Sequence, residues 1–170
     1  MRKAKLAYAP LIAIALSVPA TSVAKAATFS ESQQTAFAQK MARSHNKSFN
    51  QKAASYVKAL EGVPYVYGGT SRSGFDCSGL TQYVYRHLGK KIWRTAEEQF
   101  REFRRISKAR ARGGDLVFFH ETSNPNSYVY HVGIYEGGHD MVVASTGADH
   151  VIRESFAWAG NTVTFGTITH

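Results

Sequence analysis

The residue best suited to nucleophilic chemistry is Cys77, the one cysteine in a chain of 170 residues. It cannot form an intramolecular disulfide, so it is a partner-linking thiol, an inert buried residue or a reactive group. A glycine-rich stretch, Gly68 to Gly74, precedes it, and helical periodicity begins at Cys77 itself. The first turn of a helix offers unpaired N–H groups and the positive end of the dipole, which favour a thiolate. We therefore expect a lowered thiol pKa, although these residues leave an inert buried cysteine open.

A cysteine nucleophile needs a base, and the chain contains seven histidines. His87 lies ten residues further along the helical segment of Cys77, so its side chain points away from the thiol. His131 lies in the alternating run Tyr130 to Tyr135, where it shares a face with Gly133. We predict that His131 lines a cleft and acts as the base. The alternative is a partly buried, hydrogen-bonded histidine without a chemical role.

The elements that must position these residues follow from a change of period along the chain. Helical patterns come first and short β-rich runs follow, which predicts an α+β domain with a largely antiparallel sheet. Asn50 is the expected N-cap of the first helix and Gly89 the end of the second, while Thr95 to Glu98 form a capping box for the third. The expected helices are 50–60, 77–88 and 96–103; the expected strands are 115–119, 130–136, 141–145, 151–154 and 162–169.

The first 26 residues have the pattern of an export signal. Three cations near the start precede an apolar run, Leu6 to Leu16, and the triplet Ala24 to Ala26 fits a cleavage site. The run is shorter than the roughly 20 apolar residues of a membrane-spanning helix, so a retained anchor is the weaker interpretation. We therefore expect a signal peptide at 1–26, a leader or helix at 27–49 and a folded, extracytoplasmic domain at 50–170.

The composition excludes several classes of site and suggests a partner. The chain has no phosphate loop, dinucleotide fingerprint, Cys-x-x-Cys or His-Glu-x-x-His pattern, so we expect no cofactor and no metal. The formal net charge is +9. Its densest cluster is a candidate surface for an anionic wall polymer or a membrane, with a solvated face as the alternative and nucleic acid as the weakest partner. This cluster consists of Arg101, Arg104, Arg105, Lys108, Arg110 and Arg112.

Five blocks of sequence occur in order between Ser55 and Phe165: Tyr65 to Gly69, Asp76 to Gly79, Arg94-Thr95 with Gln99, Gly114 to Phe119, and His131 to Tyr135. Together they resemble the NlpC/P60 family of bacterial cell-wall cysteine peptidases. The resemblance implies a papain-like α+β fold in which N-terminal helices, with the nucleophile at a helix start, pack on a small, mainly antiparallel sheet that carries the histidine. It also implies hydrolysis of peptide bonds in peptidoglycan stem peptides, often between D-γ-glutamyl and a diamino acid.

The resemblance assigns a role to each matching position. Cys77 is the nucleophile and His131 the general base, Tyr65 supports the oxyanion, and Asp76 and Ser78 line the substrate groove. On this basis, we expect a secreted or wall-associated monomer that acts on peptidoglycan, with its catalytic domain at 50–170.

The sequence departs from the family at the third catalytic position, which orients the base. That position falls at Val143, and valine cannot form a hydrogen bond to an imidazole. Ser145, which shares a strand face with Val143, is a candidate replacement, as are a backbone carbonyl and a water. Two alternatives to an efficient peptidase stay open, and Val143 motivates the first of them. One is a catalytically weak or inactive wall-binding module, and the other is a cysteine amidase or acyltransferase on the same scaffold.

Overall fold

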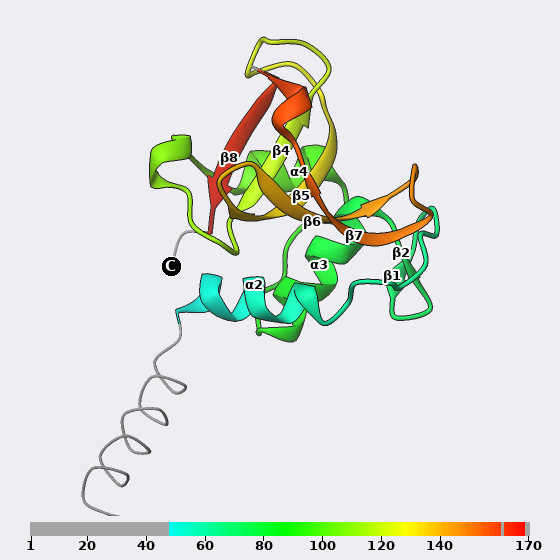
Figure 1. Cartoon of the computed structure of the whole chain (residues 1–170). Coiled ribbons are helices and arrows are strands. Elements are labelled where there is room, and N and C mark those ends of the chain that lie inside the picture. The colour runs from blue at the N-terminus through cyan, green and yellow to red at the C-terminus, as the bar shows by residue number, and fades with distance from the viewer. Residues whose placement is uncertain (1–47, 161, 169–170) are drawn as a thin grey trace, which may run out of the picture. The chain divides into compact units, whose positions relative to one another are not determined.

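A six-stranded antiparallel sheet forms the centre of the computed structural model, which describes residues 48–160 and 162–168 (Figure 1). The strand order is β3-β8-β4-β5-β6-β7, so both β4 and β5 are interior strands. Every neighbouring pair is antiparallel. The strands are β3 (Arg104–Ile106), β4 (Leu116–His120), β5 (Val129–Gly137), β6 (Asp140–Ser145), β7 (His150–Ser155) and β8 (Val163–Thr167).

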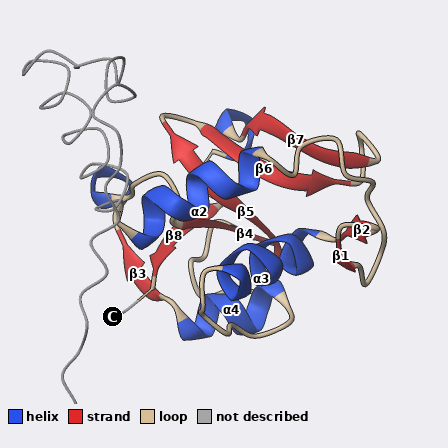
Figure 2. Ribbon diagram, turned by 90° about the horizontal axis from the view of Figure 1, so that it is seen from below, coloured by secondary structure: helices blue, strands red, loops and turns tan. Residues whose placement is uncertain are grey.

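Three helices cover one face of this sheet, as Figure 2 shows. They are α2 (Phe49–Lys58), α3 (Cys77–His87) and α4 (Ala96–Glu102). Their apolar stripes pack on the even-numbered strand residues, among them Phe118, Val132 and Ile134, all fully buried. The α+β fold expected from the order of helical and strand patterns is therefore confirmed.

The odd-numbered strand residues form a second apolar cluster on the other face. Val117, Tyr135 and Val143 pack there against Phe156, with the short 3₁₀ helix η2 (Ala157–Ala159) at the rim. Val143 is fully buried in this cluster. The candidate third catalytic position is therefore part of an apolar core.

The expected N-cap of the first helix was wrong. Ser48 caps α2, because its hydroxyl accepts from the Gln51 N–H and the Gln51 side chain accepts from the Ser48 N–H. Asn50 lies inside the helix and donates to the Asp115 carboxylate at 2.5 Å. This bond holds α2 against the start of β4. Gly114, which precedes β4, has a φ of +96°, and a Cβ at this position would collide with the Asn50 carbonyl.

The ends of the other two helices agree with the sequence pattern. The backbone leaves α3 at Leu88 and Gly89 has a φ of +86°, while Thr95 and Glu98 form the predicted capping box of α4. The hairpin of β1 (Thr70–Ser71) and β2 (Gly74–Phe75) was not expected, nor was β3, which pairs with β8.

The expected signal peptide at 1–26 lies outside the described residues, as does the leader at 27–49 except for its last two positions. Among residues 48–160 and 162–168, no helix is long and apolar enough to span a membrane.

Candidate active site

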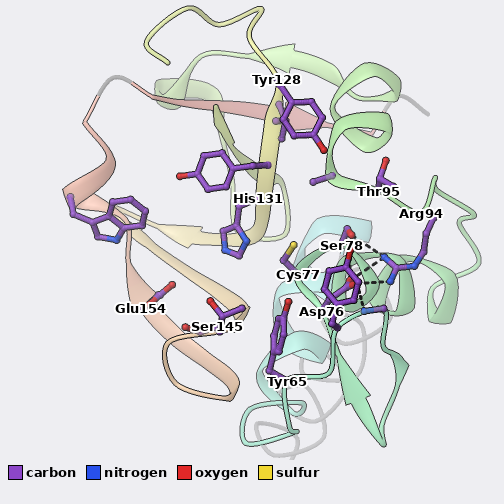
Figure 3. Close-up of a pocket in the computed structure, with 17 residues that line it drawn as sticks. Tyr65, Asp76, Cys77, Ser78, Arg94, Thr95, Tyr128, His131, Ser145 and Glu154 are labelled. Carbon is purple, nitrogen blue, oxygen red and sulfur yellow. Dashed lines mark hydrogen bonds and ion pairs between the residues drawn. The ribbon is translucent and has the colours of Figure 1, made fainter. Parts of the chain in front are cut away.

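Cys77 and His131 line the same cavity, whose volume is about 780 Å³. Cys77 is the first residue of α3 and His131 lies near the start of β5. Figure 3 shows the sulfur of Cys77 and the ring of His131 facing each other. The packing of α3 on the interior strand β5 thus brings together two residues that lie 54 positions apart in the sequence.

The start of α3 is held by Asp76, the residue before Cys77. Its Oδ1 accepts from the Gly79 N–H at 2.6 Å, and its Oδ2 accepts from the Gly68 N–H at 3.0 Å. The glycine-rich turn therefore lies against the helix end. A Cβ on Gly79 would approach the Gly69 carbonyl oxygen to 2.0 Å, so only glycine permits this contact two residues after Cys77.

Arg94 forms a two-point ion pair with Asp76. Arg94 Nη2 donates to Oδ2 at 2.5 Å, while Nη1 donates to Oδ1 at 3.1 Å and to the Ser78 hydroxyl at 3.0 Å. Hydrogen bonding to Asp76 raises the pKa of Arg94 further. Asp76 and Ser78 both line the cavity, and both accept hydrogen bonds from Arg94. The sequence contained the signal for this arginine, the Arg94-Thr95 block, yet did not reveal its partner.

His131 is a neutral imidazole whose ring is placed by packing. Burial lowers its pKa to about 4. Its ring lies 5.3 Å from the ring of Phe119, centroid to centroid, and forms no hydrogen bond to any residue among 48–160 and 162–168. Ser145 lines the cavity, but its hydroxyl accepts from the Ala148 N–H at 3.4 Å and does not bond His131. Neither Val143 nor Ser145 thus orients the base in this structure.

The thiol pKa differs from the sequence expectation. Burial raises the pKa of Cys77 above its ordinary value, and the negative charge of Asp76 raises it further. Hydrogen bonds from the backbone of Val132 and Ser78 oppose the shift without reversing it. The expected lowering by the helix start was therefore wrong, because the thiol is buried beside a carboxylate. The resting pair is a neutral thiol and a neutral imidazole.

Alkylation of the native protein should follow this raised pKa. At pH 7 a smaller fraction of Cys77 is thiolate than of free cysteine, so iodoacetamide should react more slowly with it. The rate should rise with pH through a midpoint above the roughly 8.5 of a free thiol. Mass spectrometry of the pH series measures this, with the urea-unfolded chain as the control that returns to the ordinary midpoint. If the pH midpoint of alkylation is lower in the native protein than in the unfolded chain, the raised pKa of Cys77 is contradicted.

Tyr65 is positioned as an additional hydrogen-bond donor. Its backbone N–H donates to the Asp149 carbonyl at 2.7 Å, and its side chain lines the cavity with the hydroxyl toward Cys77 (Figure 3). Burial raises the pKa of its phenol, and the nearby Cys77 and Asp76 raise it further. The hydroxyl therefore keeps its proton at neutral pH and is available to donate.

The basic cluster of residues 101–112 does not form one continuous face. Arg101 pairs with Glu97 on α4, and Arg105 lies over the ring of Phe100. Three arginines instead line a second cavity of about 500 Å³, which shares no lining residue with the first. These three are Arg104, Arg110 and Arg112.

A partly buried cysteine at a helix start facing a neutral histidine on an antiparallel sheet is the arrangement of a cysteine hydrolase. Residues 62–165 match the NlpC/P60 family, and the chain belongs to that family. The family comprises cysteine peptidoglycan hydrolases and includes non-catalytic members.

Two similar proteins illustrate this membership, and a third shares the fold. The bifunctional muramidase/DL-endopeptidase CwlT of Bacillus subtilis is 40% identical over 110 residues, which cover 64% of this chain and 33% of CwlT. The NlpC/p60 domain of the peptidoglycan hydrolase SagA is 31% identical with a TM-score of 0.61, covering 70% of this chain and 98% of that domain. RipD of Mycobacterium tuberculosis, a non-catalytic NlpC/p60 domain protein adapted to peptidoglycan binding, is 22% identical with a TM-score of 0.58. That match covers 72% of this chain and 99% of the RipD chain.

Proposed function

We propose that this protein is an exported cysteine endopeptidase that hydrolyses stem peptides of peptidoglycan between D-γ-glutamyl and a diamino acid. The observation that carries the proposal is the facing pair of Cys77 and His131 in one cavity. The DL-endopeptidase named in CwlT supports the choice of bond. Since this chain spans a third of CwlT, the muramidase activity is not transferred.

The neutral pair acts when a substrate carbonyl lies against the thiol. His131 takes the thiol proton as the sulfur bonds to the carbonyl carbon, and the Cys77 N–H and the Tyr65 hydroxyl donate to the developing oxyanion. The imidazolium then gives its proton to the leaving amine, which departs as the C–N bond breaks. Finally, His131 takes a proton from a water that attacks the thioester, and the acid product leaves as the thiol regains its proton.

The remaining parts of the proposal concern location and partners. In this proposal, residues 1–26 are a signal peptide, 27–49 are a leader or helix, and 50–170 are the catalytic domain of a secreted or wall-associated monomer. Arg104, Arg110 and Arg112 around the second cavity form the attractive surface for an anionic wall polymer or membrane.

Digestion of purified peptidoglycan tests the proposed bond. Mass spectrometry should find new D-glutamyl γ-carboxyl ends and new diamino acid α-amines, each cleavage adding one water. Products in which an added amine or alcohol replaces the water would favour the acyltransferase alternative, and water added at a different amide bond would favour the amidase alternative. Intact stem peptides after prolonged digestion would favour the binding module instead.

The buried Val143 keeps the weak or inactive module as the second candidate function. RipD shows that such a module occurs on this fold. If turnover is limited because no side chain orients His131 through a hydrogen bond, Val143→His should raise kcat about tenfold with little change in KM. The reason is that orientation of the base acts on the transition state. Steady-state kinetics on a soluble stem peptide measures this.

Val143→Leu is the matched control, since it changes shape without adding a hydrogen bond. Both variants should unfold at a lower denaturant concentration than the wild type. Val143→His should lose about 1–3 kcal/mol in the free energy of unfolding, because an imidazole replaces a buried apolar side chain. Equal kcat in the wild type and a folded Val143→His variant would show that orientation of His131 does not limit the rate.

A further inference from the structure

Glu154 is a carboxylate that the proposed mechanism does not use. It lies on β7, lines the active-site cavity and is half-buried. Figure 3 shows Glu154 and Ser145 on one side of the pair formed by Cys77 and His131, with Arg94 on the opposite side. The cavity therefore extends from Arg94 past the catalytic pair to Glu154.

Glu154 has no cationic partner among residues 48–160 and 162–168. The adjacent Arg153 points to the other face of β7 and donates to Asp140 at 2.7 Å. Arg94 is already paired with Asp76, and His131 is neutral at pH 7 because burial lowers its pKa to about 4. Burial also raises the pKa of the Glu154 carboxyl, with no opposing charge to lower it.

The cavity therefore has a net negative charge, although the protein as a whole is basic. Among the described residues that line it, Asp76 and Glu154 are acidic and Arg94 is basic, so two negative charges and one positive charge give −1 when Glu154 is ionised. The whole chain has a formal net charge of +9. The negative charge that remains is located beside His131, away from Arg94 (Figure 3).

An exposed aromatic ring lines the same cavity as Glu154. Trp158 lines the cavity, is 66% exposed, and stacks on Phe119 with ring centroids 5.6 Å apart and planes 18° apart. Phe119 is also the ring that packs against His131. A carboxylate and the face of a tryptophan lining one cavity are groups that bind a primary ammonium.

The direction of the reaction determines which part of a substrate reaches this end. The histidine gives its proton to the leaving amine, so the leaving residue must lie on the His131 side of the thiol. In the proposed bond the leaving residue is the diamino acid, whose side chain carries a second amine. That amine is a primary ammonium when the stem is not cross-linked and an uncharged amide when it is.

We infer that Glu154, with Trp158, forms a subsite for the side-chain ammonium of the leaving diamino acid, and so selects stems whose side-chain amine is free. The inference rests on the proposed function, since it names the substrate form preferred by the same site. It predicts that uncross-linked stems are cleaved in preference to cross-linked ones.

A pair of soluble substrates isolates this contact. Stem tetrapeptides, in lysine and diaminopimelate forms, are prepared with the side-chain amine either free or acetylated, and kcat/KM is measured for each. The wild type should prefer the free amine about tenfold, equivalent to about 1.4 kcal/mol. Glu154→Gln should lower kcat/KM for the free amine alone, bringing the ratio close to one.

Two further variants give the inference its controls. Glu61→Gln removes an exposed carboxylate outside the cavity and should keep the tenfold ratio. Trp158→Leu should reduce the ratio about threefold, while Trp158→Phe should retain most of it, because the ring face is preserved. Equal cleavage of the two wild-type substrates would overturn the inference, as would equal losses on both in Glu154→Gln.

Failure of the proposed function can be distinguished from failure of this inference. If the wild type cleaves no substrate, calorimetry measures binding of the same peptides to Cys77→Ala. A preference for the free amine that Glu154→Gln removes would support the ammonium subsite in a binding module. The same affinity for both peptides would refute the subsite whatever the activity of the protein.

Discussion

Replacing Cys77 with alanine is expected to lower kcat/KM on stem peptides by about 10⁴-fold or more, because the covalent route is lost with the sulfur. His131→Ala should cause a loss of similar size. Since the two residues act as one unit, the double variant should be little worse than either single variant. Single-turnover assays with a soluble stem peptide can resolve these rates.

The fold should tolerate the loss of the thiol, which separates a chemical effect from a structural one. Asp76 caps α3 without involving the Cys77 side chain, so Cys77→Ala should unfold within about 1 kcal/mol of the wild type. Hydrolysis that persists in a folded Cys77→Ala protein would exclude Cys77 as the nucleophile. If Cys77→Ala hydrolyses more slowly only because part of the protein is unfolded, Cys77 is likewise excluded as the nucleophile.

Asp76→Ala is expected to produce the largest loss of stability, about 3–5 kcal/mol in the free energy of unfolding. The substitution removes the N-cap of α3 and the acceptor of the Gly68 N–H, and leaves the guanidinium of Arg94 without its carboxylate. Asp76→Asn should cost less, because asparagine remains a good N-cap while the charge is lost. Urea unfolding measures both.

An exposed ion pair provides the matched control for Asp76. Asp140 also accepts from an arginine, Arg153, at 2.7 Å, but both side chains are largely exposed. Asp140→Ala should therefore cost no more than about 1 kcal/mol. If Asp76→Ala and Asp140→Ala destabilise the protein equally, the contacts of Asp76 at the start of α3 do not support the fold more than an exposed ion pair does.

Local patterns were sufficient to predict most of the elements around the site. The alternation around His131 predicted a strand, and the capping box at Thr95 predicted the start of α4, because both signals depend on neighbours within a few residues. The resemblance to NlpC/P60 peptidases identified the family, which the match of residues 62–165 establishes. The wrong N-cap at Asn50 arose because Ser48 and Gln51 form a better local pair.

The thiol pKa could not be derived from the same local patterns. A helix start lowers the pKa of a cysteine when the thiol is exposed to water, but the packing of α3 on the sheet buries Cys77 beside Asp76 and raises it. Likewise, the cations of residues 101–112 are close in sequence, but Arg101 pairs with Glu97 on α4, whereas Arg104, Arg110 and Arg112 line a second cavity.

By itself, the sequence determined which residue types can react at this site and which elements carry them. Only the tertiary structure decided their charge states and partners: a neutral Cys77 and His131, an Asp76 held by Arg94, and a Glu154 without a cation among the described residues. The physical reason is that helix and strand signals are local, whereas burial and ion pairing depend on residues that only folding brings together.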